Sequence, residues 1–404
     1  MVVLQTRPEP MPVPAAPAVT AVAVPSTRDL RLDLFRGIAL WLIFLDHIPS
    51  NIVSWITIRN YGFSDAAEMF VFISGYTAAF VYGRAMRERG FVVAGARILK
   101  RAWQVYVAHV FLFVIYLAEI AYVSKNFESS LYAEEWNIFD FLKQPDVTLV
   151  QALMLKFKPV NMDVLPLYIV LLVGFPAVLW LLLRRPALAL AASAALYALA
   201  RTFEWNFPAY PSGEWVFNPL AWQLLFVIGG WCGVGGADRI SGLIRSRIVT
   251  AFAVAYLVFA FVIVMTWYFP RYGYLVPHWL GELIYPIDKA NLDVMRLVHF
   301  LALAVLAVRF VPPGWPALEL PVFRPAILCG QHSLEIFCLG VFLAFAGHFI
   351  RVELSGGPLL QLLISITGIG VMIGVAWLLR WYQALEGRGP AKRSRNADFA
   401  GGDV

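Results

Sequence analysis

The sequence has few charged residues and few cysteines. Only 14% of its 404 residues are Asp, Glu, Lys or Arg, and 60% are hydrophobic, whereas a soluble domain usually carries about 25% charged residues. This shortage of charge excludes a soluble globular domain and predicts an integral membrane protein. The three cysteines, Cys232, Cys329 and Cys338, lie in or beside apolar runs. They show neither a metal-ligand spacing nor a disulfide framework.

Several other patterns are also missing. The basic residues that give the formal net charge of +6 lie where membrane topology would place them, so we expect no nucleic-acid partner. The sequence has no HExxH pattern and no repeated Glu-x-x-His pair, so we expect no metal site. It also lacks a convincing internal repeat, which argues against an inverted-repeat transporter.

Apolar runs of about 20 residues, the length that a helix needs to cross a bilayer, occur ten times. The fold class that we predict is therefore all-α: a polytopic integral membrane protein with about ten transmembrane helices in a lipid bilayer. The predicted spans are 35–56, 65–83, 103–123, 164–183, 187–203, 219–237, 248–268, 294–311, 331–350 and 359–381.

Positive charge alternates between the connections that join these spans. Arg and Lys gather before the first span, between the second and third, and in later connections on the same side, whereas 124–163 is richer in acidic residues. The positive-inside rule then places both termini in the cytoplasm. We divide the chain into a disordered Pro- and Ala-rich tail (1–27), which is neither signal peptide nor span, a membrane domain (28–385) and a basic cytoplasmic tail (386–404).

The first predicted span carries two adjacent ionisable residues, Asp46 and His47, near its middle. Arg36 lies eleven residues before His47, and eleven helical steps return to nearly the same stripe after a rise of roughly 16 Å. Asp33 falls on the same stripe. Pro49 predicts a helix kink beside His47, and backbone groups freed at that depth are tolerated only against protein or a wet cavity. We therefore predict Arg36 near the cytoplasmic face and His47 in a polar cavity.

Ionisable residues inside a membrane are functional by default, and a neutral His near a carboxylate can accept a proton from a hydroxyl. His47 is therefore a candidate general base. Adjacent side chains on a helix point about 100° apart, so Asp46 orients His47 only if the kink distorts the turn, and otherwise contacts another helix. The alternative is a polar pair that only holds helices together.

Asp65 and Glu68 begin the second predicted span, and two roles are open for them. They form a helix N-cap with its capping-box partner, or they face the same cavity as His47. Ser74 and Gly75 are a small pair that favours close helix packing.

Polar residues also interrupt the later apolar runs. Asp293, Arg296 and His299 share a helix face, which predicts a salt-bridged cluster, and His332 and Glu335 are also three residues apart. The candidate donor- or substrate-binding residues are Asp33, Arg36, Asp65, Glu68, Ser74, Trp222, Gln223, Asp288, Lys289, Arg296, His332 and Glu335, beside the catalytic candidates Asp46 and His47.

Seven sequence blocks occur in order: RLDLFRG (31–37), DHIP (46–49), SDAAEMFVFISGY (64–76), PLYIVLL (166–172), NPLAWQLLF (218–226), DKANL (288–292) and CGQHSLEIF (329–337). By these blocks the chain resembles the OpgC family, which O-succinylates osmoregulated periplasmic glucans, within the membrane acyltransferase-3 superfamily. Arg36 and His47 meet the short signature of that superfamily, a basic residue followed by a histidine after ten intervening positions.

The resemblance implies acyl transfer across the bacterial inner membrane by a multi-pass protein with no permanently bound cofactor. The donor would be cytoplasmic acyl-CoA, with succinyl-CoA expected, and it would enter on the basic face near Arg36 and the Arg cluster that follows the second span. The acceptor would be a hydroxyl of a periplasmic glucan or another carbohydrate, and His47 would be the general base.

Three other functions stay open. The first is O-acylation of another cell-envelope polysaccharide. The second is a proton-coupled transporter that uses Asp46, His47, Asp65 and Glu68 as a proton relay. The third is a polysaccharide exporter or sensor without catalytic activity.

Overall fold

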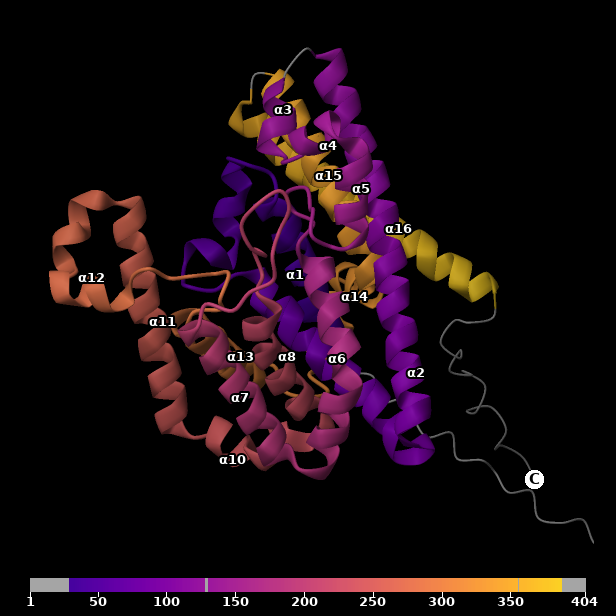
Figure 1. Ribbon diagram of the computed structural model, residues 1–404. Helices are drawn as coiled ribbons and strands as arrows, with labels where there is room; N and C mark the ends of the chain where they lie inside the picture. Colours follow the sequence, from indigo (N-terminus) through magenta and orange to yellow (C-terminus); the bar gives the residue numbers. More distant parts are fainter. Residues whose placement is uncertain (1–28, 128–129, 355, 387–404) are drawn as a thin grey trace, which may run out of the picture.

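The computed structural model describes residues 29–127, 130–354 and 356–386. These residues form helices joined by irregular segments (Figure 1), and within them the only β-pairing is an isolated bridge between Pro208 and Glu214. The N-terminal tail predicted for 1–27 lies outside the described residues. The same holds for the C-terminal tail predicted for 386–404, except for Glu386.

Six helical segments of the described chain are long and apolar enough to cross a membrane. They are α2 (Ala66–Asn126), α6 (Val164–Arg184), Pro219–Arg239, α11 (Arg247–Tyr268), α15 (Ser333–Glu353) and α16 (Pro358–Leu385). The helices α7 (Pro186–Thr202) and α13 (Val294–Phe310) also coincide with predicted spans, and α1 (Leu30–Asp46) overlaps the first of them. The all-α membrane class is thus confirmed, whereas the count of ten spans and the cytoplasmic termini stay predictions.

Short helices fill the connections and the ends of the long helices. They are η1 (Ile52–Ile56), η2 (Ile58–Asn60), α3 (Ser130–Glu135), α4 (Phe139–Lys143), α5 (Pro145–Leu153), η3 (Cys232–Gly236), α9 (Ala237–Arg239), α10 (Ser241–Ile244), η4 (Pro270–Leu275), α12 (His278–Ile284), η5 (Pro316–Glu319) and α14 (Arg324–Gln331). The segment Pro219–Arg239 begins with α8 (Pro219–Trp231) and continues through η3 and α9.

The long helix α2 consists of two arms. Gly90, with φ +81°, is not helical and separates 66–89 from 91–126, in a backbone region that glycine enters without the steric penalty of a Cβ atom. The two arms contain the second and third predicted spans. The second arm runs along one side of the molecule to the end where α3, α4 and α15 lie (Figure 1).

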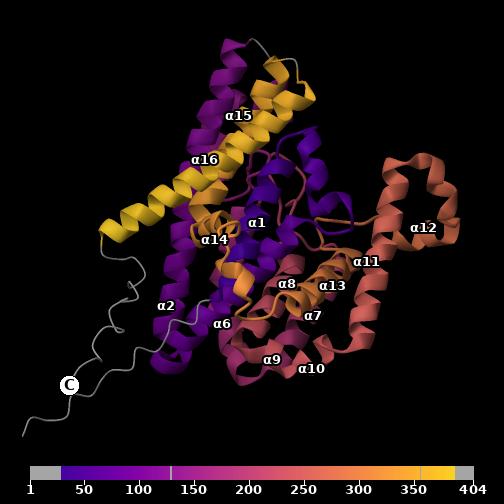
Figure 2. The ribbon, with the colours of Figure 1, turned by 180° about the vertical axis from the view of Figure 1, so that it is seen from behind.

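Helix α1 lies at the centre of the bundle and packs against α2, α14 and α15 (Figures 1 and 2). A Cβ atom on Gly37 would lie 1.8 Å from the backbone oxygen of Ala326, and one on Gly330 would lie 1.9 Å from that of Asp33. The backbones of α1 and α14 are therefore in direct contact, which only residues without a side chain allow. This contact buries Asp33 and turns the rest of α1 towards α2.

The predicted packing role of Gly75 is also supported by the structure. A Cβ atom on Gly75 would lie 2.1 Å from the backbone oxygen of Phe226 in α8. The first arm of α2 and α8 therefore approach each other as closely as α1 and α14 do. Ser74, the other member of the small pair, lies beside this contact on the same arm.

The first predicted span, 35–56, is not one kinked helix. Helix α1 ends at Asp46, His47 is its C-cap, and the chain turns through Ser50, with φ +54°, before η1 begins. Pro49 has no N–H to donate to the carbonyl of Leu45, and a proline disfavours helical backbone at the residue before it. The helix therefore stops instead of bending, and His47 lies at its end.

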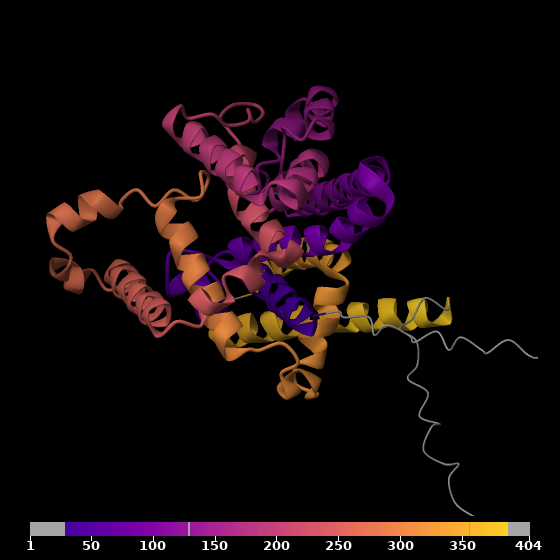
Figure 3. The same ribbon diagram turned by 90° about the horizontal axis from the view of Figure 1, so that it is seen from below.

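Helices α11 and α12 project from the bundle (Figures 1 and 3). After α12 the chain returns to the bundle through 285–293 and enters α13. This returning segment carries Lys289, whose side chain lines the cavity that also contains His47. The projecting hairpin and its return therefore form one wall of the candidate site.

Candidate active site

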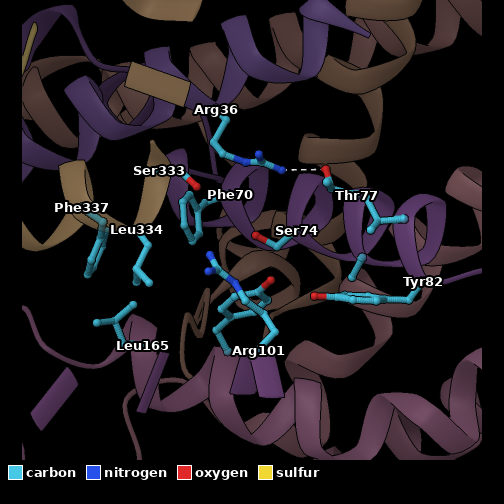
Figure 4. Close-up of a pocket in the computed structure, with 13 residues that line it drawn as sticks. Arg36, Phe70, Ser74, Thr77, Tyr82, Arg101, Leu165, Ser333, Leu334 and Phe337 are labelled. Atoms are coloured by element: carbon cyan, nitrogen blue, oxygen red, sulfur yellow. Dashed lines mark hydrogen bonds between the residues drawn. The ribbon is translucent and has the colours of Figure 1, made fainter. Parts of the chain in front are cut away.

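One pocket lies beside the first half of α1 and has a volume of about 130 Å³. We call it the inner pocket because the predicted topology places this end of α1 towards the cytoplasm. Its polar lining includes Arg36, Ser74, Thr77 and Arg101. Arg36 donates to Thr77 Oγ1 at 2.6 Å and to the backbone oxygen of Ile73 at 3.4 Å. Figure 4 shows the side chains of Arg36 and Arg101 reaching into this space from opposite sides. Two guanidinium groups with neighbouring hydroxyls suit an anionic ligand.

The outer cavity lies at the other end of α1 and is larger, about 640 Å³. Asp46, His47, Asp65, Lys289 and Arg296 all line it, so the structure brings together five of the residues that the sequence selected. A volume of this size lies within the range of small-molecule sites, about 300–1,000 Å³. The polar cavity predicted around His47 is present.

The two pockets almost meet inside the bundle. Val164 lines the outer cavity and the next residue, Leu165, lines the inner pocket. On α2, Ala67 lines the outer cavity and Phe70 lines the inner pocket, and three helical residues rise only about 4.5 Å. A thin layer of side chains that includes Phe70 and Leu165 therefore separates them.

His47 and Asp46 do not bond to each other. The ring of His47 lines the outer cavity, and its Nδ1 atom is buried without a hydrogen-bond partner in the described part of the chain. Asp46 Oδ1 accepts from Thr57 Oγ1 at 2.8 Å, in the connection after η1. Because α1 ends instead of kinking, Asp46 contacts its own following segment. Asp46 therefore does not orient His47, and its partner Thr57 caps the short helices η1 and η2 instead of belonging to another membrane-spanning helix.

Asp65 fills both of the roles that the sequence left open, whereas Glu68 fills only the capping role and does not line the cavity. Asp65 accepts from the backbone N–H of Ala67 at 2.8 Å, and Glu68 accepts from that of Asp65 at 2.9 Å, which completes a capping box. Arg296 donates to Glu68 Oε1 at 2.8 Å and to Asp65 Oδ2 at 3.1 Å, and Lys289 Nζ lies 2.6 Å from the same Asp65 oxygen. One buried network thus starts α2 and forms part of the cavity wall.

Trp222 and Asp288 hold the segment that carries Lys289. Trp222 is fully buried, and its Nε1 donates to the backbone oxygens of Lys289 and Ala290, both at 3.1 Å. Asp288 accepts from the backbone N–H of Ala290 at 2.7 Å and from Asn291 Nδ2 at 2.6 Å. Neither side chain lines one of the two pockets, so we assign both to the positioning of Lys289.

Four other candidate residues do not line either of the two pockets. Asp33 is buried where α1 crosses α14, and His332 is buried at the end of α14. Gln223 bonds to the side chain and backbone of Ser193, which ties α8 to α7. Glu335 is exposed in the first turn of α15. Their binding roles stay predictions without support from their positions.

The predicted cluster of Asp293, Arg296 and His299 does not form. Asp293 caps α13 and pairs with Arg201 at 2.8 Å. Arg296 pairs with the two carboxylates of α2, and His299 Nδ1 lies 2.7 Å from Ser64 Oγ. The three side chains share one helix, but Asp293 finds its partner on α7, and Arg296 and His299 find theirs at the start of α2. Helical spacing alone cannot show such partners because they are distant in sequence.

Several residues of the outer cavity were not selected from the sequence. Arg59, Asn161, Asp163, Trp267 and Tyr268 line it, and Asn161 Nδ2 donates to the backbone oxygen of His47 at 3.3 Å. They come from connections and helix ends that are far apart in sequence. No local pattern links them, although Trp267 and Tyr268 follow one another at the end of a predicted span.

A buried lysine holds the connection that covers this cavity. Lys158 Nζ lies 3.7 Å from Asp163 Oδ1 and 3.8 Å from the centre of the Trp215 ring. Burial lowers the pKa of Lys158 to about 8, and the nearby Asp163 carboxylate opposes part of that shift. Lys158 and Asp163 therefore form a buried pair at the cavity wall.

The described chain contains no group of three or more His, Cys, Asp or Glu side chains arranged to hold a metal ion. It shows instead two pockets with polar linings. An anion-suited pocket and a cavity with a histidine almost meet inside a bundle of apolar helices. These features define a class: a polytopic membrane protein with two polar pockets on opposite sides of a thin barrier.

The sequence model of the family described as OpgC protein matches residues 28–384, and the chain belongs to this family. Membership implies a membrane acyltransferase of the kind that acts on glucans. No match was found among the curated proteins or among the solved structures. The resemblance seen in the seven sequence blocks is therefore confirmed.

Proposed function

We propose that this protein transfers a succinyl group from cytoplasmic succinyl-CoA to a hydroxyl of a periplasmic glucan, in the inner membrane of a bacterium. The observation that carries the proposal is the arrangement of two polar pockets along α1. Arg36 lines one and His47 the other, and the barrier between them is thin. A thioester that crosses this barrier meets a base on the far side.

The donor would bind at the inner pocket. Its volume of about 130 Å³ is too small for a whole CoA molecule, so the nucleotide would stay at the basic surface and only the pantetheine arm would enter. Arg36 and Arg101 would contact the anionic part of the donor near the pocket. Movement of Phe70 and Leu165, which line this pocket where it meets the outer cavity, would open the path for the acyl end.

The chemistry would take place in the outer cavity. His47 takes the proton of the acceptor hydroxyl as its oxygen attacks the thioester carbonyl. The new C–O bond forms, the C–S bond breaks, and the CoA thiolate leaves and takes up one proton to become the thiol. His47 returns its proton to solvent or to the thiolate, so the sum is one ester and one free CoA for each thioester.

Two cations of the outer cavity offer a partner to an acyl group that carries its own carboxylate. Lys289 and Arg59 line this cavity, and the side chain of Lys289 is 42% exposed although it pairs with Asp65. A succinyl carboxylate would meet these cations, whereas an acetyl group has no charge to place there. Purified protein offered succinyl-CoA and acetyl-CoA with a glucan should therefore ester-link succinate in preference to acetate.

The same assay tests the alternatives. Transfer to a bacterial polysaccharide but not to a glucan would favour another envelope acceptor, and proton-coupled transport without acyl transfer would favour the transporter. The absence of any acyl-CoA turnover by folded protein would contradict the proposal as a whole.

Replacing Arg36 with Ala should weaken donor binding. Hydrogen bonds to charged groups contribute about 1.5–3 kcal/mol, so we expect the KM for acyl-CoA to rise by about ten- to a hundredfold. Arg36→Lys keeps the positive charge but lacks the planar guanidinium, so its KM for acyl-CoA should lie between the values of wild type and Arg36→Ala. The measurement is the dependence of initial rate on acyl-CoA concentration.

Arg239→Ala is the matched control for this experiment. Arg239 is an exposed arginine in α9 that does not line the inner pocket, so its loss should leave the KM for acyl-CoA unchanged. An unchanged KM in Arg36→Ala, with the variant as heat-stable as wild type, would remove Arg36 from the donor site.

A further inference from the structure

The mouth of the outer cavity has an aromatic rim, formed by Trp55, Trp267 and Tyr268. Trp267 and Tyr268 line the cavity, and the ring centre of Trp55 lies 4.5 Å from that of Tyr268. The three residues come from η1 and from the end of α11, which meet here. All three keep between a third and a half of their surface exposed: 41% for Trp55, 44% for Trp267 and 37% for Tyr268.

The polar ends of the two cavity-lining rings are bound to protein. Tyr268 donates its hydroxyl hydrogen to Asn60 Oδ1, and Trp267 donates its Nε1–H to the hydroxyl oxygen of Tyr285. Trp and Tyr of a membrane-interface belt have the opposite arrangement, in which the ring is in lipid and the polar end reaches water or headgroups. Bonds to protein at the polar ends hold these rings in place, while both residues keep more than a third of their surface exposed to a ligand.

Polar side chains lie within the same cavity. Asp46, Asn161 and Asp163 line it beside His47. A pyranose ring has the matching chemistry, because one of its faces presents C–H groups while hydroxyls surround its edge. Ligand sites commonly combine aromatic contact area with a few polar groups that fix orientation. Neither a lipid tail nor an unbranched acyl chain would use both parts of this surface.

We propose that Trp267 and Tyr268, supported by Trp55, form the acceptor subsite, where the C–H face of a glucan pyranose stacks on the rings and one hydroxyl points to His47. The assignment rests on the proposed function for the identity of the acceptor. The subsite adds residues that select a ring-shaped acceptor. These residues are distinct from the base and from the residues of the donor site. Binding of a glucan at this rim is measurable without any acyl transfer.

The test compares glucan binding and acceptor kinetics in Trp267→Leu, Trp267→Phe and wild type. Aromatic stacking contributes on the order of 1 kcal/mol, so Trp267→Leu should weaken binding of a linear glucan oligosaccharide by about tenfold and raise its KM by a similar factor. Trp267→Phe keeps an aromatic ring and should therefore recover much of the lost glucan affinity.

Trp279→Leu is the matched control. Trp279 lies on α12, is 65% exposed and does not line the cavity, so its loss should leave glucan binding unchanged. Leucine is at least as compatible with lipid as tryptophan, so a rim that only contacts lipid would tolerate Trp267→Leu. Unchanged glucan affinity in that variant, or no glucan binding by wild type, would overturn the subsite. Glucan binding without acyl transfer would instead refute the proposed function and leave the subsite standing.

Discussion

Replacing His47 with Ala should lower the rate of acyl transfer by about 10²–10⁴-fold, the usual contribution of a positioned general base. The imidazole lines the outer cavity and is the group there that would take the proton of the attacking hydroxyl. The expected loss is in kcat, because the proposed donor and acceptor contacts involve other residues. The measurement is single-turnover transfer to a glucan by purified protein at saturating succinyl-CoA.

Two control variants show whether the loss belongs to the imidazole. His278→Ala removes a histidine whose side chain is 91% exposed on α12, and it should transfer at the wild-type rate. Asp46→Asn keeps an oxygen that can accept from Thr57, so we expect a smaller loss than for His47→Ala. A near-normal transfer rate in His47→Ala would exclude His47 as the general base. An equal loss of rate in Asp46→Asn would indicate that Asp46 takes part in the proton transfer.

Replacing Arg296 with Met should destabilise the folded protein by about 3–5 kcal/mol, the usual effect of removing one partner from a buried ion pair. Glu68 has a fully buried side chain and pairs with Arg296 at 2.7 Å, and Asp65 shares the same guanidinium. Without the cation, two neighbouring carboxylates would be left in the bundle with Lys289 as their remaining cationic partner. Thermal unfolding in detergent measures the effect.

Neutralising the carboxylates should reverse that loss. In the triple variant Asp65→Asn, Glu68→Gln, Arg296→Met, the Asn and Gln side chains can still form the capping box that begins α2. No unpaired carboxylate remains at this site, so stability should return close to the wild-type value. A triple variant as unstable as Arg296→Met would show that the guanidinium acts through packing and not through its charge.

The helical class and the positions of the helices could be predicted because a bilayer imposes one strong pattern. A helix needs about 20 apolar residues to cross it, and each predicted span overlaps a helix or helix arm, although the first continues ten residues past the end of α1. The capping box at Asp65 was likewise visible because it needs only residues three apart. Close packing at Gly75 followed from residue size alone.

The end of α1 could not be predicted because a proline permits two outcomes. Pro49 allows either a kink or a stop, and here the chain turns at Ser50 and bonds Asp46 to Thr57. Only the tertiary position of the connection after α1 decides between the two outcomes. The partner of Asp46 was missed for the same reason.

The candidate site was predicted in part. Arg36 and His47 were recognised because both lie on one helix, and their separation along it is fixed by helical geometry. Arg59, Asn161 and Trp267 were not recognised, since they reach the outer cavity from three connections or helix ends. Asp293 and His299 were grouped with Arg296 by spacing, but their partners lie on other segments. Residues that meet only through the fold leave no periodic signal.

The most direct test of the account is a structure of the protein with a non-hydrolysable succinyl-CoA analogue. We predict the pantetheine arm in the inner pocket beside Arg36 and Arg101, with the acyl carbonyl past Phe70 and Leu165 and within reach of the His47 imidazole. An analogue whose acyl end stays on the Arg36 side of that barrier, with His47 closed off from it, would contradict transfer through the bundle.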